Sequence, residues 1–339
     1  MKTTDFFYDL PQELIAQTPC ANRGGSRMLH LPLNGDPIQH TMFRNLPEFL
    51  KPGDCLVMND SRVMPARLLG KRSGGGAAEL LLLKPLGGDD WEVLARPGRK
   101  LMPGAIVSFG EAMSAEICSV GENGLRHVRF RYSGDWNLLL EELGRTPLPP
   151  YIKQELSDRE RYQTVYSKHM GSAAAPTAGL HFTENMLDTL RAKGVHTEFV
   201  TLHVGLGTFR PVQEETIEAH KMHTETFSIS AETAQRINDA KAAGGRVIAI
   251  GTTSCRVLES VADEQGQLRE MHGETDIFIY PGYRFKILDG LFTNFHLPES
   301  TLLMLVSALA GRERILSAYQ EAVRERYRFF SFGDAMLIL

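Results

Sequence analysis

Strand and helix patterns alternate through residues 145–339, and this alternation restricts the fold more than any other feature of the sequence. The hydroxyls of Thr183, Ser230 and Ser300 each stand at the start of a predicted helix, where they cap free backbone amides. Glycine stops the first two helices after residues 193 and 243. The predicted strands are 199–203, 246–250, 277–280 and 291–295. Strands that alternate with helices form layered α/β structures.

Residues 64–134 have a different pattern, in which six short predicted strands are separated by Gly-rich breaks such as Gly74-Gly75-Gly76. The predicted strands are 66–70, 78–84, 91–95, 105–109, 115–120 and 125–131. Strands of this length and spacing predict a small barrel. We therefore predict a layered α/β domain, formed by residues 1–63 and 137–339, that is interrupted by an inserted small β-barrel domain at 64–136.

The cysteines and the apolar segments indicate where such a chain works. Cys20, Cys55, Cys118 and Cys255 lie far apart, without metal-ligand or redox spacing, which favours reduced thiols and a cytoplasmic location. The N-terminus lacks the apolar core of a signal peptide, and the longest apolar run, 302–310, is too short to cross a bilayer. We expect a monomer that makes no contact with membranes.

Basic residues concentrate in the predicted barrel. The whole chain has a net charge of −4, which argues against a general nucleic-acid binder. Residues 62–134 nevertheless contain 11 Lys or Arg and 7 Asp or Glu, a local charge of +4. These cations either keep the surface soluble or contact RNA phosphates. The candidate phosphate contacts are Arg62, Arg67, Arg96, Arg99 and Lys100.

Several polar clusters follow predicted strands, at the end of an α/β sheet where ligands bind. Thr252-Thr253-Ser254 follows the strand at 246–250 and opens a helix, so its hydroxyls and amides suit a carboxylate or phosphate. Thr208-Phe209-Arg210 lies in a Gly-rich loop after the strand at 199–203, where Arg210 offers a fixed cation. An ordinary capped turn and an ordinary tight loop explain these two patterns equally well.

Histidines stand in three further clusters. His181 ends a loop of small residues that begins near Ala174, and His296 follows Asn294 at another strand end. His220 and His223 lack a third and fourth ligand at known spacing, so no metal site is predicted. For His223 and Glu225 we expect a role as polar partners.

Longer phrases of the sequence are specific enough to indicate a family. They include RYQTVYSKHMGSAAAPTAGLHF at 161–182, TLHVGLGTFRPV at 201–212, ETDIFIYPGYRFK at 274–286, LFTNFHLPESTLLMLV at 291–306 and the final YRFFSFGDAMLIL. Together with NDSRVMPARL near position 60 and LPPYI at 148–152, they resemble the S-adenosylmethionine:tRNA ribosyltransferase-isomerase family of queuosine biosynthesis. The resemblance covers essentially the whole chain.

The resemblance implies a reaction between two substrates. It implies transfer and isomerisation of the ribosyl group of S-adenosylmethionine onto 7-aminomethyl-7-deazaguanine at the tRNA wobble position. The product is epoxyqueuosine-tRNA, and adenine and methionine leave. S-adenosylmethionine is a substrate here, and neither a cofactor nor a metal is implied. Two other functions remain open: a methyltransferase that uses S-adenosylmethionine on RNA, and a non-catalytic RNA-binding protein.

This chemistry requires a base near the 5′ carbon of the ribose, and histidine is the best-tuned candidate at neutral pH. We favour His181, because a helix N-terminus disfavours its charged form. His203, His223 and His296 are rivals. An acid that assists adenine departure is predicted at Asp60, at Asp276 or at another histidine.

The remaining predicted contacts concern S-adenosylmethionine. Its sulfonium can rest against an aromatic face, and its carboxylate against hydroxyls or a cation. The candidates for all substrate contacts are Thr177, Phe182, Thr208, Phe209, Arg210, His223, Glu225, Thr252, Thr253, Ser254, Tyr280 and Asn294.

Overall fold

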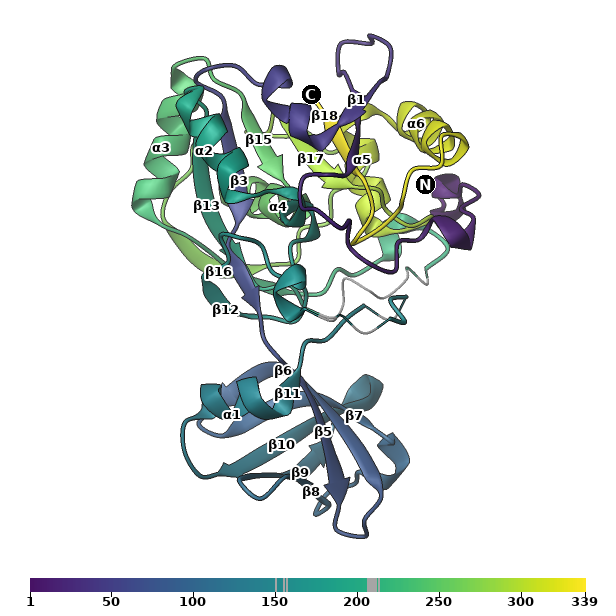
Figure 1. Cartoon of the computed structure of the whole chain (residues 1–339), viewed down its shortest axis with the longest axis vertical. Coiled ribbons are helices and arrows are strands. Elements are labelled where there is room, and N and C mark those ends of the chain that lie inside the picture. The colour runs from purple at the N-terminus through teal and green to yellow at the C-terminus, as the bar shows by residue number, and fades with distance from the viewer. Residues whose placement is uncertain (150, 155, 157, 206–211, 213) are drawn as a thin grey trace. The chain divides into compact units, whose positions relative to one another are not determined.

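The chain forms two compact units in its computed structural model, which describes residues 1–149, 151–154, 156, 158–205, 212 and 214–339 (Figure 1). The first unit contains residues 1–62, 150–169 and 175–339, and the second contains 63–149 and 170–174. The second unit thus includes the predicted barrel segment, 64–136, and extends beyond it to take in helix α1 (Trp136–Leu143).

A nine-stranded mixed sheet forms the centre of the first unit, in the order β16-β14-β13-β3-β15-β17-β18-β1-β2. Four central strands run parallel, so their carboxyl ends lie at one edge: β13 (His196–Leu202), β3 (Cys55–Asn59), β15 (Val247–Ile250) and β17 (Gly290–Asn294). β14 (Glu225–Ile229) is antiparallel to β13 and to β16 (Met271–Thr275), so β14 begins at that edge and β16 ends there. The other strands are β18 (Ala335–Ile338), β1 (Arg27–Leu31) and β2 (Gln39–Met42).

Helices cover both faces of this sheet. Leu56 of β3 shares a hydrophobic core with Leu187 of helix α2 (Glu184–Ala192). Val57 of β3 points to the face opposite Leu56, and Glu198 of β13 lies in register with Val57. Glu198 forms an ion pair with Arg236 of helix α3 (Ala231–Ala242) on that face. Because α2 and α3 lie on opposite faces, the sheet is the middle layer of an α/β structure. The predicted fold class is confirmed.

The predicted helix caps are confirmed as well. Thr183 Oγ1 accepts a hydrogen bond of 3.1 Å from the Met186 amide, and Gly194 follows the helix with φ of +84°. Ser230 and Ser300 cap their helices in the same way. The remaining helices of the first unit are α4 (Thr252–Val261), α5 (Thr301–Ala310) and α6 (Arg312–Arg324). None of the helices in the described residues has the length and apolar character needed to span a bilayer.

The predicted strand at 277–280 is wrong. These residues are irregular, and the strand of this region lies earlier, at β16. The apolar residues that suggested a strand serve packing instead, since Ile279 is buried and the Phe278 ring contacts the rings of His220 and Tyr280. Strand preference is a preference for a half-buried pleated surface, and it does not supply a neighbouring strand.

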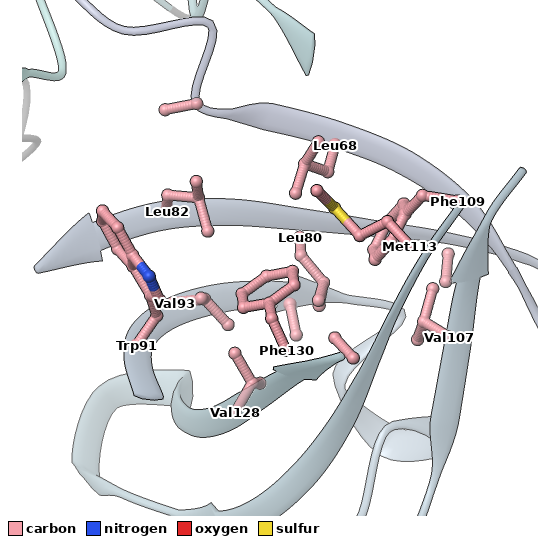
Figure 2. Packing of buried hydrophobic residues seen from close by; sticks show 14 of the residues in the cluster. Leu68, Leu80, Leu82, Trp91, Val93, Val107, Phe109, Met113, Val128 and Phe130 are labelled. Carbon is pink, nitrogen blue, oxygen red and sulfur yellow. The ribbon is translucent and has the colours of Figure 1, made fainter. Parts of the chain in front are cut away.

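The second unit is a closed barrel of six antiparallel strands. Its strands are β5 (Arg67–Arg72), β6 (Ala77–Gly87), β7 (Asp90–Arg96), β10 (Leu125–Tyr132), β9 (Met113–Val120) and β8 (Ile106–Phe109), and β5 also pairs with β8. Alternate side chains such as Leu80, Leu82, Val93 and Phe130 fill the interior (Figure 2). All six predicted strands are therefore confirmed. The described residues also contain three short strands, β4 (Ser61–Val63), β11 (Gly144–Arg145) and β12 (His169–Ser172).

Candidate functional site

Polar side chains gather where the parallel strands of the first unit end. Asp60 directly follows β3, His203 follows β13, Thr252 begins the helix after β15, and Asn294 ends β17. Because these four strands are parallel neighbours, their ends form one edge of the sheet. This is the edge at which α/β sheets bind their ligands.

Asp60 is a buried carboxyl group at this edge. Its Oδ1 accepts a hydrogen bond of 2.7 Å from Thr201 Oγ1, and its Oδ2 lies 3.6 Å from Nε2 of His169. Burial raises the pKa of Asp60, whereas the Thr201 hydroxyl and the charges of His169 and Lys168 oppose this effect. A carboxyl group with a raised pKa keeps its proton to higher pH, which is the property that a general acid needs.

His203 is a half-buried imidazole at the end of β13. Its Nδ1 is buried and, within the described part of the chain, has no hydrogen-bond partner. Burial lowers the pKa of His203, the charge of His169 lowers it further, and the charge of Asp60 opposes both. The ring is therefore neutral near pH 7 and has a nitrogen available for a proton.

His181 ends a short 3-10 helix, η7 (Thr177–His181), and both of its ring nitrogens have partners. Nδ1 lies 2.7 Å from Ser26 Oγ, and Nε2 lies 3.1 Å from Nδ2 of Asn294. Thr177 Oγ1 donates a hydrogen bond of 3.0 Å to Asn294 Oδ1, which turns the amide nitrogen of Asn294 toward His181. Nε2 of His181 is therefore the acceptor, and Nδ1 carries the proton toward Ser26.

The surroundings of His181 keep its ring neutral, but both ring nitrogens already have hydrogen-bond partners. Burial, together with the charges of Arg328 and Arg23, lowers the pKa of His181 to about 4. The ring packs against those of Phe43 and Phe292, with each centroid 5.7 Å away. The lone pair that a base would use is already shared with Asn294, so this geometry favours a positioning role for His181.

A surface pocket borders His181 within the first unit. Its lining includes Cys20, Ser26, Arg23 and Arg161. The two guanidinium groups donate to backbone carbonyls, for example Arg161 Nη1 to the Ala21 oxygen at 3.0 Å. They stabilise the wall of the pocket and give it positive charge. His181 thus lines a pocket that suits a polar ligand, and it is joined to Asn294 and Thr177 by hydrogen bonds.

Three other predicted site residues serve packing or backbone contacts. His296 is buried, which lowers its pKa to about 3, and its Nε2 lies 3.0 Å from Thr293 Oγ1. Phe182 has no exposed surface and packs among other core rings. Ser254 Oγ donates to the Ile250 carbonyl oxygen at 3.0 Å. These environments are those of core residues, which favours a structural role for all three.

The remaining predicted site residues either lie near the edge of the site or fall outside the described residues. Asp276 is exposed just after β16, and Tyr280 is half-buried beside Phe278. Thr208, Phe209 and Arg210 fall outside the described residues, so their predicted roles stay predictions.

Arg256 of α4 was missed by the sequence analysis. It is only 4% exposed, and its Nη1 pairs with Oε2 of Glu225 at the start of β14. Glu225 Oε1 accepts the Gly205 amide at 2.8 Å and lies 3.3 Å from Nε2 of His223. Burial alone would raise the pKa of Glu225, but His223, Arg256 and the Gly205 amide bring it down to about 2. The available signal was an arginine between the apolar helix residues Cys255 and Val257.

The sequence predicts no metal site, and this stays a prediction. His220 Nδ1 lies 2.8 Å from Glu214 Oε2. Elsewhere, in the barrel, possible ligand atoms of Asp90, Cys118 and His127 lie within 4.8 Å of one another. Both Asp90 oxygens already accept hydrogen bonds from Arg129, at 2.8 and 2.9 Å, which competes with coordination of a cation.

Two of the five predicted phosphate contacts, and two further arginines of the barrel, are paired with carboxylates. Arg62 lies 2.5 Å from Glu160, and Arg67 lies 2.9 Å from Glu79. Further pairs of this kind are Arg129 with Asp90 and Arg131 with Glu116. An exposed cation that is paired with a carboxylate contributes little net charge toward a phosphate.

A turn beside β7 carries unpaired cations. Arg96, Arg99 and Lys100 are exposed, and none of them has an ion pair within the described residues. Buried Arg126 supports this turn, because its guanidinium donates to the carbonyls of Gly98 and Leu101 at 3.0 and 2.9 Å. Of the predicted phosphate contacts, these three side chains are therefore the ones with free charge.

Comparison with known proteins gives matches over the full length. A family model described as "Queuosine biosynthesis protein" matches residues 3–338. Curated proteins named S-adenosylmethionine:tRNA ribosyltransferase-isomerase are similar to this chain, with 58% identity in Acetivibrio thermocellus and 56% in Clostridioides difficile, each covering 100% of both chains. The crystal structure of an S-adenosylmethionine tRNA ribosyltransferase from Thermotoga maritima is also similar, with 40% identity, a TM-score of 0.58 and coverage of 99% of this chain and 100% of that chain.

Proposed function

The chain belongs to the queuosine biosynthesis protein family, and we propose that it acts as an S-adenosylmethionine:tRNA ribosyltransferase-isomerase. In this reaction the ribosyl group of S-adenosylmethionine is transferred and isomerised onto 7-aminomethyl-7-deazaguanine at the tRNA wobble position. Epoxyqueuosine-tRNA forms, while adenine and methionine leave. The observation that carries the proposal is 58% identity to an enzyme of this name over the whole of both chains.

The geometry of the sheet edge supports a division of roles. We assign the general base to His203, whose buried Nδ1 has no partner in the described residues and can take the proton from the 5′ carbon beside the sulfonium. Asp60 has a raised pKa and is the candidate acid that protonates departing adenine. Hydrogen bonds join His181 to Asn294 and Asn294 to Thr177, and the proposed role of these residues is to position the ligand.

Product analysis tests the reaction directly. With S-adenosylmethionine and tRNA that carries the aminomethyl-deazaguanine, the protein should release adenine and methionine in equal amounts as the tRNA base gains mass. The same yield is expected with a strong chelator present, because we propose that no metal takes part. Release of S-adenosylhomocysteine would instead identify a methyltransferase, and binding of tRNA without turnover would identify a non-catalytic RNA-binding protein.

The turn at Arg96, Arg99 and Lys100 is the proposed phosphate contact of the barrel. Changing Arg99 or Lys100 to glutamine should weaken tRNA binding and make its dependence on salt shallower. The expected change in the log–log slope is about one unit for each lost phosphate contact. Filter binding between about 50 and 200 mM salt measures both effects.

Arg131 provides the matched control for this prediction. It is an exposed arginine of the same barrel, but it pairs with Glu116 at 3.0 Å. Arg131→Gln should leave the salt slope unchanged. Equal losses for Arg99→Gln and Arg131→Gln would show that only total charge matters, and the proposal of a specific phosphate contact would fail.

We also propose that the protein works as a monomer in the cytoplasm. All four cysteines are free thiols, and Cys55 and Cys255 are buried. Burial raises the pKa of both buried thiols, so they resist oxidation and act as small apolar side chains. Free thiols are typical of proteins that work in a reducing compartment.

A further inference from the structure

Arg256 presents a hydrogen-bonding edge that the protein itself leaves unused. Its Nη1 pairs with Glu225, but its Nε and Nη2 have no hydrogen-bond partner in the described residues, although both atoms are buried. A buried guanidinium normally satisfies its donors, because an unpaired buried donor loses its hydration without compensation. Two unpaired donors on one group therefore point to an occupant from outside the chain.

The chemistry of this edge selects an anion with two oxygens. Nε–H and the neighbouring Nη2–H of a guanidinium are parallel donors, and their spacing matches the two oxygens of a carboxylate. Glu225 already balances part of the charge from the other side through Nη1. It also holds the guanidinium plane in place, so little side-chain entropy is lost when an anion binds.

A second unpaired group lies on the same helix as this edge. Thr253 stands three residues before Arg256 on α4, and residues at this spacing share one face of a helix. Its Oγ1 is also buried and has no partner in the described residues. Both residues belong to the first turns of α4, where the helix dipole favours negative charge. The helix begins at the ligand-binding edge of the sheet, immediately after β15.

We propose that Arg256 and Thr253 bind the carboxylate of the methionine portion of S-adenosylmethionine. This inference rests on the proposed function, because it takes its ligand from there. Nε–H and Nη2–H of Arg256 each donate to one carboxylate oxygen, and the Thr253 hydroxyl donates to one of them. Of the residues predicted for this carboxylate, Ser254 is excluded because its hydroxyl bonds the Ile250 carbonyl.

Binding measurements with two ligands test the proposal. The probes are S-adenosylmethionine and its decarboxylated form, which keeps the sulfonium, ribose and adenine. Arg256→Lys keeps the positive charge opposite Glu225 but removes the two parallel donors. This variant should bind S-adenosylmethionine about 10- to 100-fold more weakly, the loss expected for a charge-assisted bidentate contact. Its affinity for the decarboxylated form should equal that of the wild type.

A matched control separates this role from a structural one. Arg246 also pairs with a buried carboxylate, Asp54, at 2.5 Å, but at the opposite edge of the same strands. Arg246→Lys should leave both affinities unchanged. Thr253→Val, which keeps the side-chain shape and removes the hydroxyl, should weaken binding of S-adenosylmethionine alone by roughly 3- to 10-fold. This second variant keeps the test valid if Arg256→Lys does not fold.

Three results would overturn the inference. The wild type could bind both ligands equally, Arg256→Lys could lose both ligands to the same extent, or neither variant could change the affinity for S-adenosylmethionine. Each of these outcomes is independent of turnover. If the wild-type protein binds S-adenosylmethionine but forms no adenine, the proposed function fails while the carboxylate site stands.

Discussion

Replacing His203 with asparagine is expected to lower kcat by about 10²–10⁴-fold, which is the usual loss when a general base is removed. The affinity for S-adenosylmethionine should change little, because the proposed role of His203 is to accept a proton during the reaction. Asparagine has a similar size and polarity at the Nδ1 position, so the end of β13 should keep its backbone bond to the Thr226 oxygen. Single-turnover rates of adenine release, measured at saturating substrate, test this expectation.

The dependence of rate on pH gives a second measure of the same role. A base works only when unprotonated, so kcat/KM of the wild type should fall as pH decreases through the pKa of His203. Burial lowers this pKa from the ordinary value of 6.5, so the midpoint of the fall should lie below pH 6.5. The residual activity of His203→Asn should lack this acid limb.

Two further variants show whether the assignment is correct. His272 is an exposed histidine on β16, and His272→Asn should react at the wild-type rate. His181→Asn should chiefly weaken ligand binding, because His181 shares its Nε2 with Asn294. A wild-type rate for His203→Asn together with a loss of 10²-fold or more for His181→Asn would return the base to His181.

The local features of the fold could be predicted because each depends on residues close in sequence. Thr183 caps its helix through an amide three residues away, and the barrel strands alternate inward and outward side chains within a few positions. The error at 277–280 has the opposite origin. Its composition is that of a strand, but β16 occupies the pairing edge of β14 and leaves those residues to pack as irregular chain.

The candidate site could be predicted only in part, for the same reason. The positions of Asp60, His203 and Asn294 at strand ends follow from the sequence, and the parallel order of the strands brings them to one edge. The roles of the histidines depend on contacts between distant residues. Ser26 and Asn294 occupy both nitrogens of His181, and neither contact has a sequence signal. The unpaired Nε and Nη2 of Arg256 likewise cannot be predicted from the sequence, because they depend on the contact of Nη1 with the distant Glu225.

The stability of the first unit should depend strongly on Glu259 of α4, a carboxylate with no exposed surface. Its Oε2 accepts hydrogen bonds from the Tyr283 hydroxyl and the Lys286 amide, at 3.0 and 2.9 Å. Its Oε1 accepts the amides of Ile287 and Leu288, at 3.3 and 3.2 Å. The Glu259 carboxylate therefore accepts hydrogen bonds from three consecutive backbone amides of an irregular segment, residues 286–288.

Glu259→Ala should lower the free energy of unfolding by about 3–5 kcal/mol, because two buried amides and one part-buried amide lose their acceptor at about 1–3 kcal/mol each and entering water recovers part of that cost. Glu259→Gln keeps one acceptor oxygen, so its loss should be smaller. The exposed neighbour Glu264 provides the control, and Glu264→Ala should change stability by no more than about 0.5 kcal/mol.

The two tryptophans make this prediction specific to one unit. Trp91 and Trp136 stack on each other in the barrel, so tryptophan fluorescence reports unfolding of the second unit. Helices α2 to α6 all belong to the first unit and dominate the far-ultraviolet circular dichroism. Each unit has its own hydrophobic core, so Glu259→Ala should lower the urea midpoint of the dichroism and leave that of the fluorescence in place. An unchanged dichroism midpoint would show that solvent or other groups replace the carboxylate, and that Glu259 does not stabilise the segment around Tyr283.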